Sequence, residues 1–118
     1  MVEQPFLHFV ETPIFTKQID KLASIEILTA IQDELLEDPE RGDLIAGTNG
    51  ARKARIGDKR NRRGKSGAFR YIYVYFVHAE TIYLLYFYAK NEQVTLTKQE
   101  KEELALLVGY ARKSLERK

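Results

Sequence analysis

The chain has 118 residues, 44% of them hydrophobic, which is enough for one core, so we predict a single domain spanning residues 1–118. It has no cysteine, which excludes disulfides and thiolate metal sites and leads us to expect a cytoplasmic location. The N-terminal residues lack the pattern of a secretory signal, and the apolar stretches are too short to cross a bilayer as helices, so no membrane association is expected.

The first half of the chain predicts a strand followed by two helices. Residues 6–10, FLHFV, have strand composition, and Thr12 before Pro13 is typical of a helix N-cap with proline at the first helical position. Ser24 is the expected cap of a second helix, which the DPERG segment at 38–42 ends. Apolar residues at helical spacing define the buried sides: Phe15, Ile19 and Leu22 in the first helix, and Ile27, Leu28, Ile31 and Leu35 in the second.

The second half predicts four strands and a final helix. The segment 42–57 offers two short strands around Thr-Asn-Gly, and 68–77 and 81–90 have the composition of central strands covered on both faces. Thr97 and Glu100 form a capping box before a helix. The apolar stripe of that helix is Leu104, Leu107, Val108, Ala111 and Leu115. The expected fold class is therefore α+β, with a central antiparallel sheet, two helices after the first strand and one C-terminal helix.

Positive charge is concentrated between residues 52 and 70. This segment holds nine Lys or Arg and one Asp, a charge of +8, so the rest of the chain carries −6 and the net charge is only +2. A basic, glycine-punctuated segment without an apolar helical face favours nucleic acid over lipid as the partner. We expect these residues to bind RNA or the ribosome: Arg52, Lys59, Arg60, Arg62, Arg63 and Lys65.

Strand geometry predicts how the two aromatic strands pair. Their three-residue turn makes an antiparallel hairpin, in which Val77 faces Thr81 and Arg70 faces Tyr88. Lys90 is then a diagonal neighbour of Arg70. The charged end of the hairpin therefore carries two cations beside a phenol.

The short strand before the basic segment adds two more cations. Lys53 and Arg55 alternate with apolar residues, so both point to one face. If this strand pairs with the strand that begins at Arg70, the cations gather at one end of the sheet, although the long intervening segment leaves that register open. The candidate catalytic residues are Lys53, Arg55, Arg70, Tyr88 and Lys90.

Such a cluster suits cleavage of RNA by its own 2′-hydroxyl. This reaction needs a base at the hydroxyl, an acid at the leaving 5′-oxygen, and cations around the developing phosphorane. Lysine can transfer a proton when neighbouring cations favour its neutral form, whereas arginine stays charged. We therefore expect Lys53 or Lys90 to transfer protons, and Arg55 and Arg70 to hold phosphate.

Other interpretations of the basic residues stay open. They could bind a phosphate backbone without chemistry, which would make the chain a non-enzymatic RNA- or ribosome-binding module. KRNRRGK could also be a solvated loop or a nuclear address. A DNA-binding regulator is disfavoured because neither long helix has the pattern of a recognition helix. We expect no cofactor and no metal site, since the acidic run DELLEDPE is typical of a solvated helix face.

The chain resembles the RelE/HigB superfamily of bacterial toxins over nearly its whole length, and it looks closest to a HigB-like branch. The resemblance rests on FVETPIF, DPERGDLIAGTNGARKARI, GKSGAFRYIYVYF and YFYAKNE. It implies a RelE-like fold and a metal-independent mRNA interferase, a toxin that enters the ribosomal A site, cuts messenger RNA there and so inhibits translation. It also implies a cognate helix-turn-helix antitoxin, with operator DNA bound only through that antitoxin.

The resemblance extends to the candidate site, with one departure. The family has a Lys/Arg alternation after a glycine, an Arg that opens the next strand and a basic residue at the end of the last strand. These features match Lys53, Arg55, Arg70 and Lys90. Familiar members also have an arginine after the terminal lysine and a base-stacking aromatic residue in the tail. Asn91 follows the lysine here, and base stacking would fall to Tyr88.

Overall fold

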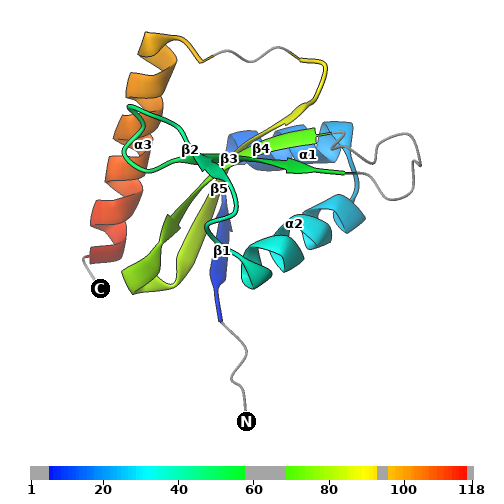
Figure 1. Ribbon diagram of the computed structural model, residues 1–118, viewed down its shortest axis with the longest axis horizontal. Coiled ribbons are helices and arrows are strands. Elements are labelled where there is room, and N and C mark those ends of the chain that lie inside the picture. Colours follow the sequence, from blue (N-terminus) through cyan, green and yellow to red (C-terminus); the bar gives the residue numbers. More distant parts are fainter. Residues whose placement is uncertain (1–5, 58–68, 93–95, 117–118) are drawn as a thin grey trace.

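The helices and strands follow the predicted order. A computed structural model describes residues 6–57, 69–92 and 96–116, and Figure 1 shows their arrangement. The elements are β1 (His8–Glu11), α1 (Pro13–Leu22), α2 (Ile25–Glu37), β2 (Asp43–Leu44), β3 (Arg52–Ile56), β4 (Phe69–Phe76), a 3-10 turn η2 (Val77–Ala79), β5 (Thr81–Ala89) and α3 (Lys98–Glu116). None of the helices in these ranges is both long and apolar enough to cross a membrane.

The five strands form one sheet in the order β1-β5-β4-β3-β2. The pairs β2/β3, β3/β4 and β4/β5 are antiparallel, whereas β1 runs parallel to β5. Parallel neighbours require a long connection, and β1 and β5 are separated by most of the chain. The predicted α+β class is confirmed, and the parallel strand at one edge is a feature that the sequence did not predict.

Capping groups fix the starts of two of the three helices as predicted. The Thr12 hydroxyl accepts a hydrogen bond from the Phe15 amide at 3.1 Å. Thr97 and Glu100 form the reciprocal capping box, with bonds of 2.9 and 3.1 Å. Ser24 precedes α2 as predicted, but its side chain makes no capping hydrogen bond.

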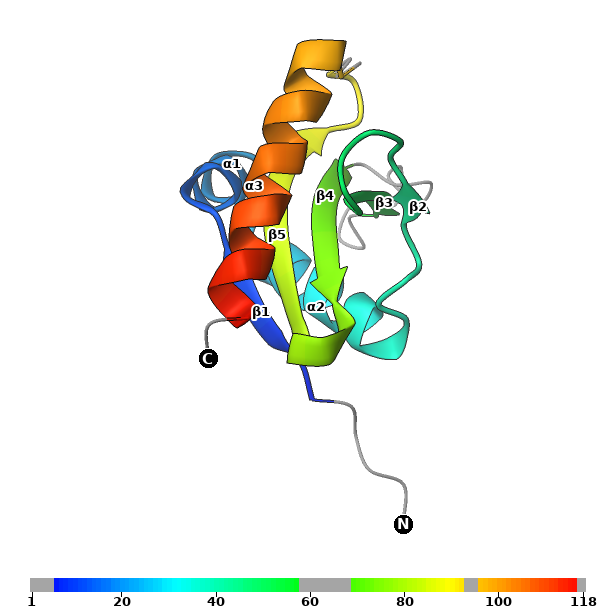
Figure 2. The same cartoon turned by 90° about the vertical axis from the view of Figure 1, so that its left-hand side faces the viewer.

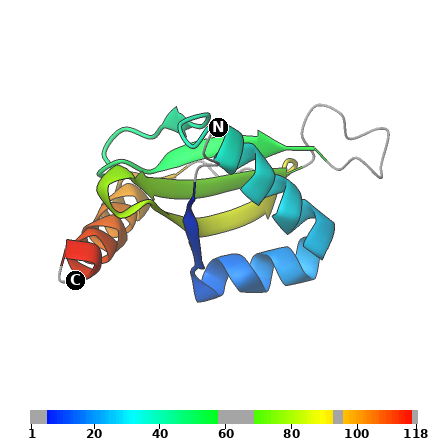
Figure 3. The same cartoon turned by 90° about the horizontal axis from the view of Figure 1, so that it is seen from below.

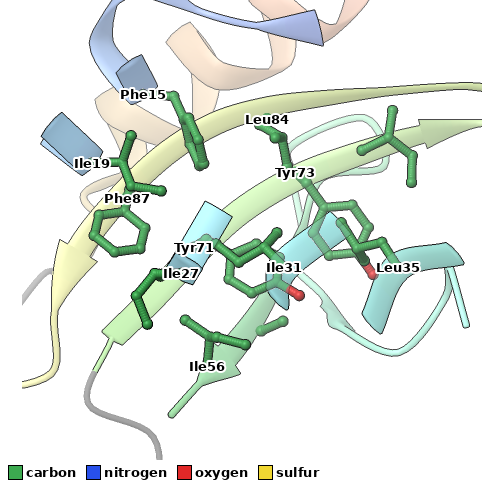
Figure 4. Packing of buried hydrophobic residues seen from close by; sticks show 12 residues of the cluster. Phe15, Ile19, Ile27, Ile31, Leu35, Ile56, Tyr71, Tyr73, Leu84 and Phe87 are labelled. Atoms are coloured by element: carbon green, nitrogen blue, oxygen red, sulfur yellow. The ribbon is translucent and has the colours of Figure 1, made fainter. Parts of the chain in front are cut away.

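Helices cover both faces of the central strands, as the sequence predicted. α1 and α2 pack on one face (Figures 3 and 4), and their cluster includes Phe15, Ile19, Ile27, Ile31, Leu35, Tyr71, Tyr73, Leu84 and Phe87. α3 packs on the other face (Figure 2), and its cluster includes Ile72, Val74, Leu85, Leu104, Val108 and Ala111. Leu107 of the predicted stripe is instead exposed, because it lies at the edge of the buried side of α3.

The hairpin register matches the prediction at the charged end and differs near the turn. Arg70 faces Tyr88 as predicted. Thr81, however, faces Phe76, because Val77 leaves the strand to begin the 3-10 turn. An irregularity in the middle of the pair shifts the register by one residue and so restores the predicted pairing at the charged end.

Candidate functional site

Three candidate residues form a row across β3, β4 and β5. Arg55 pairs with Arg70, and Arg70 pairs with Tyr88. Directly opposite residues point to the same face of a sheet. Because Tyr88 belongs to the cluster under α3, the row lies on the α3 face. The pairing of β3 with β4, which the sequence left open, is thus the one that brings the cations together.

A second row lies beside the first and crosses four strands. Asp43 of β2 pairs with Lys53, Lys53 pairs with Ile72, and Ile72 pairs with Tyr86 of β5. Lys53 is two residues from Arg55 on β3, so both point to the α3 face. The two rows together place charged residues on β2 and β3 and tyrosines on β5.

The charged ends of the rows border an open cleft of about 310 Å³. Its lining residues are Arg41, Asp43, Lys53, Ala54, Arg55 and Arg70. Lys53 and Arg55 are exposed, and within the described part of the chain neither forms an ion pair. With four cations and one carboxylate, the lining carries a formal charge of +3. A cleft of this charge attracts phosphate groups.

Arg41 is a cleft residue that the sequence did not single out. Its guanidinium forms an ion pair with Glu34 of α2. It also donates hydrogen bonds of 3.4 Å to the Arg55 carbonyl and to the Tyr71 hydroxyl. Arg41 is therefore held between α2 and β3 at the wall of the cleft. The only sequence signal was its position between a helix-ending proline and the next strand.

Tyr73 fixes the segment that carries Arg41 into β2. Its hydroxyl donates to the Pro39 carbonyl at 2.8 Å and accepts from the Gly42 amide at 2.9 Å. A Cβ atom on Gly42 would lie 2.9 Å from the Tyr73 ring and 3.0 Å from the Lys53 carbonyl oxygen, so only glycine fits there. Burial raises the pKa of Tyr73, which keeps the hydroxyl protonated.

Arg52 supports the same segment. Its guanidinium donates to the carbonyl oxygens of Glu40 at 3.0 Å and Gly42 at 2.7 Å. A nitrogen of the same group lies 3.8 Å from the Glu40 carboxylate. Because these contacts occupy its donors, Arg52 has fewer left for the RNA phosphate that the sequence led us to expect.

Tyr88 and Lys90 lie in different surroundings. Tyr88 is only 9% exposed, and burial raises the pKa of its phenol while the nearby Arg70 charge opposes this effect. Lys90 follows the last residue of β5, is exposed and does not line the cleft. The structure therefore brings together Lys53, Arg55 and Arg70, with Tyr88 beside them and Lys90 farther along the chain.

The remaining expected RNA-binding residues lie outside the described residues: Lys59, Arg60, Arg62, Arg63 and Lys65. Within residues 6–57, 69–92 and 96–116, no group of three or more His, Asp or Glu side chains could hold a metal ion.

The order of the sheet and its helices defines a RelE-like α+β fold. No protein-family model matches the sequence. Among solved structures, the chain is similar to E. coli toxin RelE in the free state, a double arginine-to-alanine mutant, with a TM-score of 0.56 and 18% identity over 86% of this chain and 96% of that one. It is similar to the isolated E. coli RelE toxin with a TM-score of 0.54 and 18% identity over 93% and 99% of the two chains. This likeness defines the fold and not the function.

Proposed function

We propose that this chain is the toxin of a toxin–antitoxin module, a ribosome-dependent endonuclease that cuts messenger RNA in the A site and so stops translation. The observation that carries the proposal is the cleft that contains Lys53, Arg55 and Arg70 on a RelE-like sheet. The sequence resemblance that selected these residues supports it independently. The HigB-like branch remains a prediction.

The proposed reaction is attack by a 2′-hydroxyl on the adjacent phosphorus. A bond forms between O2′ and phosphorus, the bond to the 5′-oxygen breaks, and the products are a 2′,3′-cyclic phosphate and a 5′-hydroxyl. Arg55 and Arg70 hold the phosphate and stabilise the added negative charge. Lys53 or Lys90 transfers the protons to and from the reacting oxygens, so the reaction needs no metal ion.

The two cleft residues added by the structure extend this assignment. Arg41 is a third guanidinium for the phosphate, and its ion pair with Glu34 orients it. Asp43 faces Lys53 across the β2/β3 pair and lines the same cleft, although the two side chains form no ion pair. A lysine at this position of the cleft can hand a proton to the leaving 5′-oxygen.

Primer extension on messages after brief induction tests the proposal. We expect discrete cuts with the wild-type chain, and a loss of cleavage of at least about a hundredfold in Lys53→Ala and Arg70→Ala, or about 2.7 kcal/mol of transition-state stabilisation. Lys17→Ala is the matched control, because Lys17 is also an exposed lysine and lies on α1, outside the cleft. Intact messages with the wild-type chain would reject the endonuclease.

The same variants separate catalysis from simple ribosome binding. If Arg70→Ala abolishes cleavage while ribosome binding falls only modestly, the cleft performs chemistry. If growth inhibition follows affinity alone and no message is cut, the chain is a non-enzymatic ribosome-binding module instead.

The proposal includes a cognate antitoxin of the helix-turn-helix type. The toxin–antitoxin complex binds operator DNA only through this antitoxin. Expression of this chain without that partner should arrest growth, and co-expression of the small protein encoded beside it should restore growth. Harmless expression of the isolated chain at high level would argue against the toxin, and an operator shift by the isolated chain would argue for a DNA-binding regulator.

A further inference from the structure

A second cavity, of about 270 Å³, lies where β5 meets α1 and the start of α3. Its apolar lining includes Ile14 of α1, Ile72 of β4 and Leu96 before α3. Its polar lining comes from two tyrosines of β5, Tyr86 and Tyr88, together with side chains of α1 and α3. We call this cavity the β5 pocket. None of these residues was assigned to it from the sequence.

Lining residues of the β5 pocket pair with lining residues of the cationic cleft along both rows. Arg70 lines the cleft and pairs with Tyr88, which lines the pocket. Lys53 lines the cleft and pairs with Ile72, which lines the pocket. Neighbouring strands are about 4.8 Å apart. A ligand with its phosphate in the cleft can therefore extend into the pocket across one or two strand spacings, which is the span of a single nucleotide.

The Tyr88 hydroxyl is available to a ligand in the pocket. The ring of Tyr88 is largely buried, since the residue is 9% exposed, and its hydroxyl makes no hydrogen bond to any described residue. No buried side-chain oxygen among the described residues lacks a partner, so this hydroxyl reaches the surface. Burial raises the pKa of Tyr88, so the phenol stays neutral at physiological pH. A ligand in the pocket can therefore bond to this hydroxyl in place of solvent.

Three carboxylates line the pocket, and one of them has no hydrogen bond to a described residue. Glu92 accepts a hydrogen bond from the Ala89 amide at 3.3 Å, and Glu100 accepts one from the Thr97 amide at 2.9 Å. Glu103 forms no hydrogen bond or ion pair among the described residues.

The Glu103 carboxylate shares the pocket with a neutral phenol. Tyr86, Glu100 and Glu103 line the same pocket. Desolvation, together with the charges of the two glutamates, raises the pKa of Tyr86, so the phenol stays protonated. The wall of the pocket therefore offers hydroxyl donors beside a carboxylate acceptor.

This combination selects one kind of nucleobase. A carboxylate has two acceptor oxygens and binds best to two adjacent N–H donors. Among the four RNA bases, only guanine has adjacent N–H donors on its pairing edge, at N1 and N2, with a carbonyl acceptor next to them for a phenol. The apolar and aromatic lining suits the flat ring, and the negative charge of the pocket disfavours phosphate, which directs the phosphate to the cleft.

We propose that the β5 pocket binds the guanine base of an RNA strand whose phosphate lies in the cationic cleft, with Glu103 and Tyr86 reading the base edge. This inference rests on the proposed function for its biological meaning, because it makes the chain a guanine-selective RNA endonuclease. The binding itself can be tested without ribosomes or cleavage.

Amide chemical shifts during titration with mononucleotides provide the direct test. GMP, AMP, CMP and UMP share a phosphate, so all four should shift amides around Lys53 and Arg70. Only GMP should also shift amides around Tyr86 and Glu103, with affinity about tenfold higher than that of the others. Equal shifts in the pocket with all four nucleotides, or no shifts in the pocket with any of them, would overturn the proposal.

Matched variants connect the selectivity to the pocket. Glu103→Gln replaces one acceptor oxygen with a donor and should remove the preference for GMP, and Tyr86→Phe should weaken it. Glu102→Gln is the control, because Glu102 is the neighbouring exposed glutamate on α3 and does not line the pocket. If Glu103→Gln and Glu102→Gln bind all nucleotides as the wild-type chain does, the assignment of Glu103 is wrong.

Cleavage positions on message then distinguish this inference from the proposed function. If the wild-type chain cuts beside guanine and Glu103→Gln loses this bias, the result supports both the endonuclease and the guanine-binding pocket. Cuts without any guanine bias leave the endonuclease standing and reject the pocket. Selective GMP binding by a chain that cuts no message rejects the endonuclease and leaves the pocket standing as a guanine-binding site.

Discussion

At the scale of single residues, the Tyr73 hydroxyl holds the segment that leads into the cleft. Tyr73→Phe removes its bonds to Pro39 and Gly42, so we expect the free energy of unfolding to fall by about 1 to 3 kcal/mol in urea denaturation. Message cleavage should fall as well, because the same segment positions Arg41. Tyr75→Phe is the control, since the half-buried Tyr75 makes no hydrogen bond to a described residue. Equal stability of the two variants would contradict this role.

The pKa of Tyr71 makes a second prediction, about alkaline stability. Burial raises this pKa from 10.0 to about 12, against the opposing effect of the Arg41 guanidinium. The folded state holds the Tyr71 proton more tightly than the unfolded state does. The contribution of this proton to the free energy of unfolding is therefore complete below pH 10 and is lost between pH 10 and about 12. The loss for this one group is about 2 to 3 kcal/mol.

Denaturant unfolding across this pH range provides the measurement. The free energy of unfolding of Tyr71→Phe should fall less steeply with pH than that of the wild-type chain. The raised pKa values of Tyr73, Tyr86 and Tyr88 will leave a residual slope. Tyr110→Phe should keep the wild-type slope, because Tyr110 is 74% exposed. An unchanged slope in Tyr71→Phe would mean that this phenol does not titrate as proposed.

At the scale of elements, α3 positions the turn that leads into β3. Arg112 of α3 donates to the Asn49 carbonyl at 3.2 Å, and its guanidinium lies 5.3 Å from the centre of the Phe76 ring. The turn has positive φ angles at Gly47, Asn49 and Gly50, so it depends on such external contacts to keep its shape. Through this turn, α3 sets the position of the strand that carries Lys53.

The third prediction concerns this contact. Arg112→Ala should lower the free energy of unfolding by about 1 to 2 kcal/mol, from a lost hydrogen bond and a lost cation–π contact. Hydrogen exchange should speed up at the amides of Ile45 and Ala51, which are bonded within the turn. Lys113→Ala is the control, because Lys113 is exposed beside it. Similar exchange in both variants would show that α3 does not hold the turn.

The elements also show what sequence patterns could predict. The alternation on β3 assigned Lys53 and Arg55 to one face correctly, because strand periodicity is local. The Arg70–Tyr88 pair was correct only because an irregularity in the middle of the hairpin compensates for the shorter strand at the turn. The residues of β4 and β5 do not indicate this shift in register, because the position of a bulge depends on how the strands pack against both helical layers.

Contacts between distant segments account for the site residues that the sequence missed. Arg41 and Asp43 join the cleft because Tyr73, about thirty residues later, binds the segment that leads into β2. The β5 pocket likewise requires α1 and α3 to meet at the end of β5. Periodicity predicts which face a side chain occupies, but not which distant segment will lie beside it.

At the scale of the whole molecule, charge separates the cationic cleft from the rest of the chain. The segment 52–70 carries +8 against −6 elsewhere, although the net charge is only +2. The cationic cleft lies at this segment, whereas three glutamates line the adjoining β5 pocket. We expect this polarity to orient a polyanion before any short-range contact forms, because the local distribution of charge steers a ligand even where the net charge is small.

The last prediction tests the five basic residues between the cleft strands: Lys59, Arg60, Arg62, Arg63 and Lys65. We assign them to docking on ribosomal RNA and not to chemistry. Replacing all five with glutamine should weaken ribosome binding and flatten its salt dependence, with each lost phosphate contact lowering the log–log slope by about 0.7 to 0.9. Single-turnover cleavage at saturating protein should stay nearly unchanged, because Lys53, Arg55 and Arg70 remain in the cleft.

The control replaces two lysines of α1, in the double variant Lys17→Gln with Lys21→Gln, which should leave the salt dependence of ribosome binding as it was. A fall in saturated cleavage of about a hundredfold in the fivefold variant would instead assign the segment to the chemical step, at about 2.7 kcal/mol of lost transition-state stabilisation.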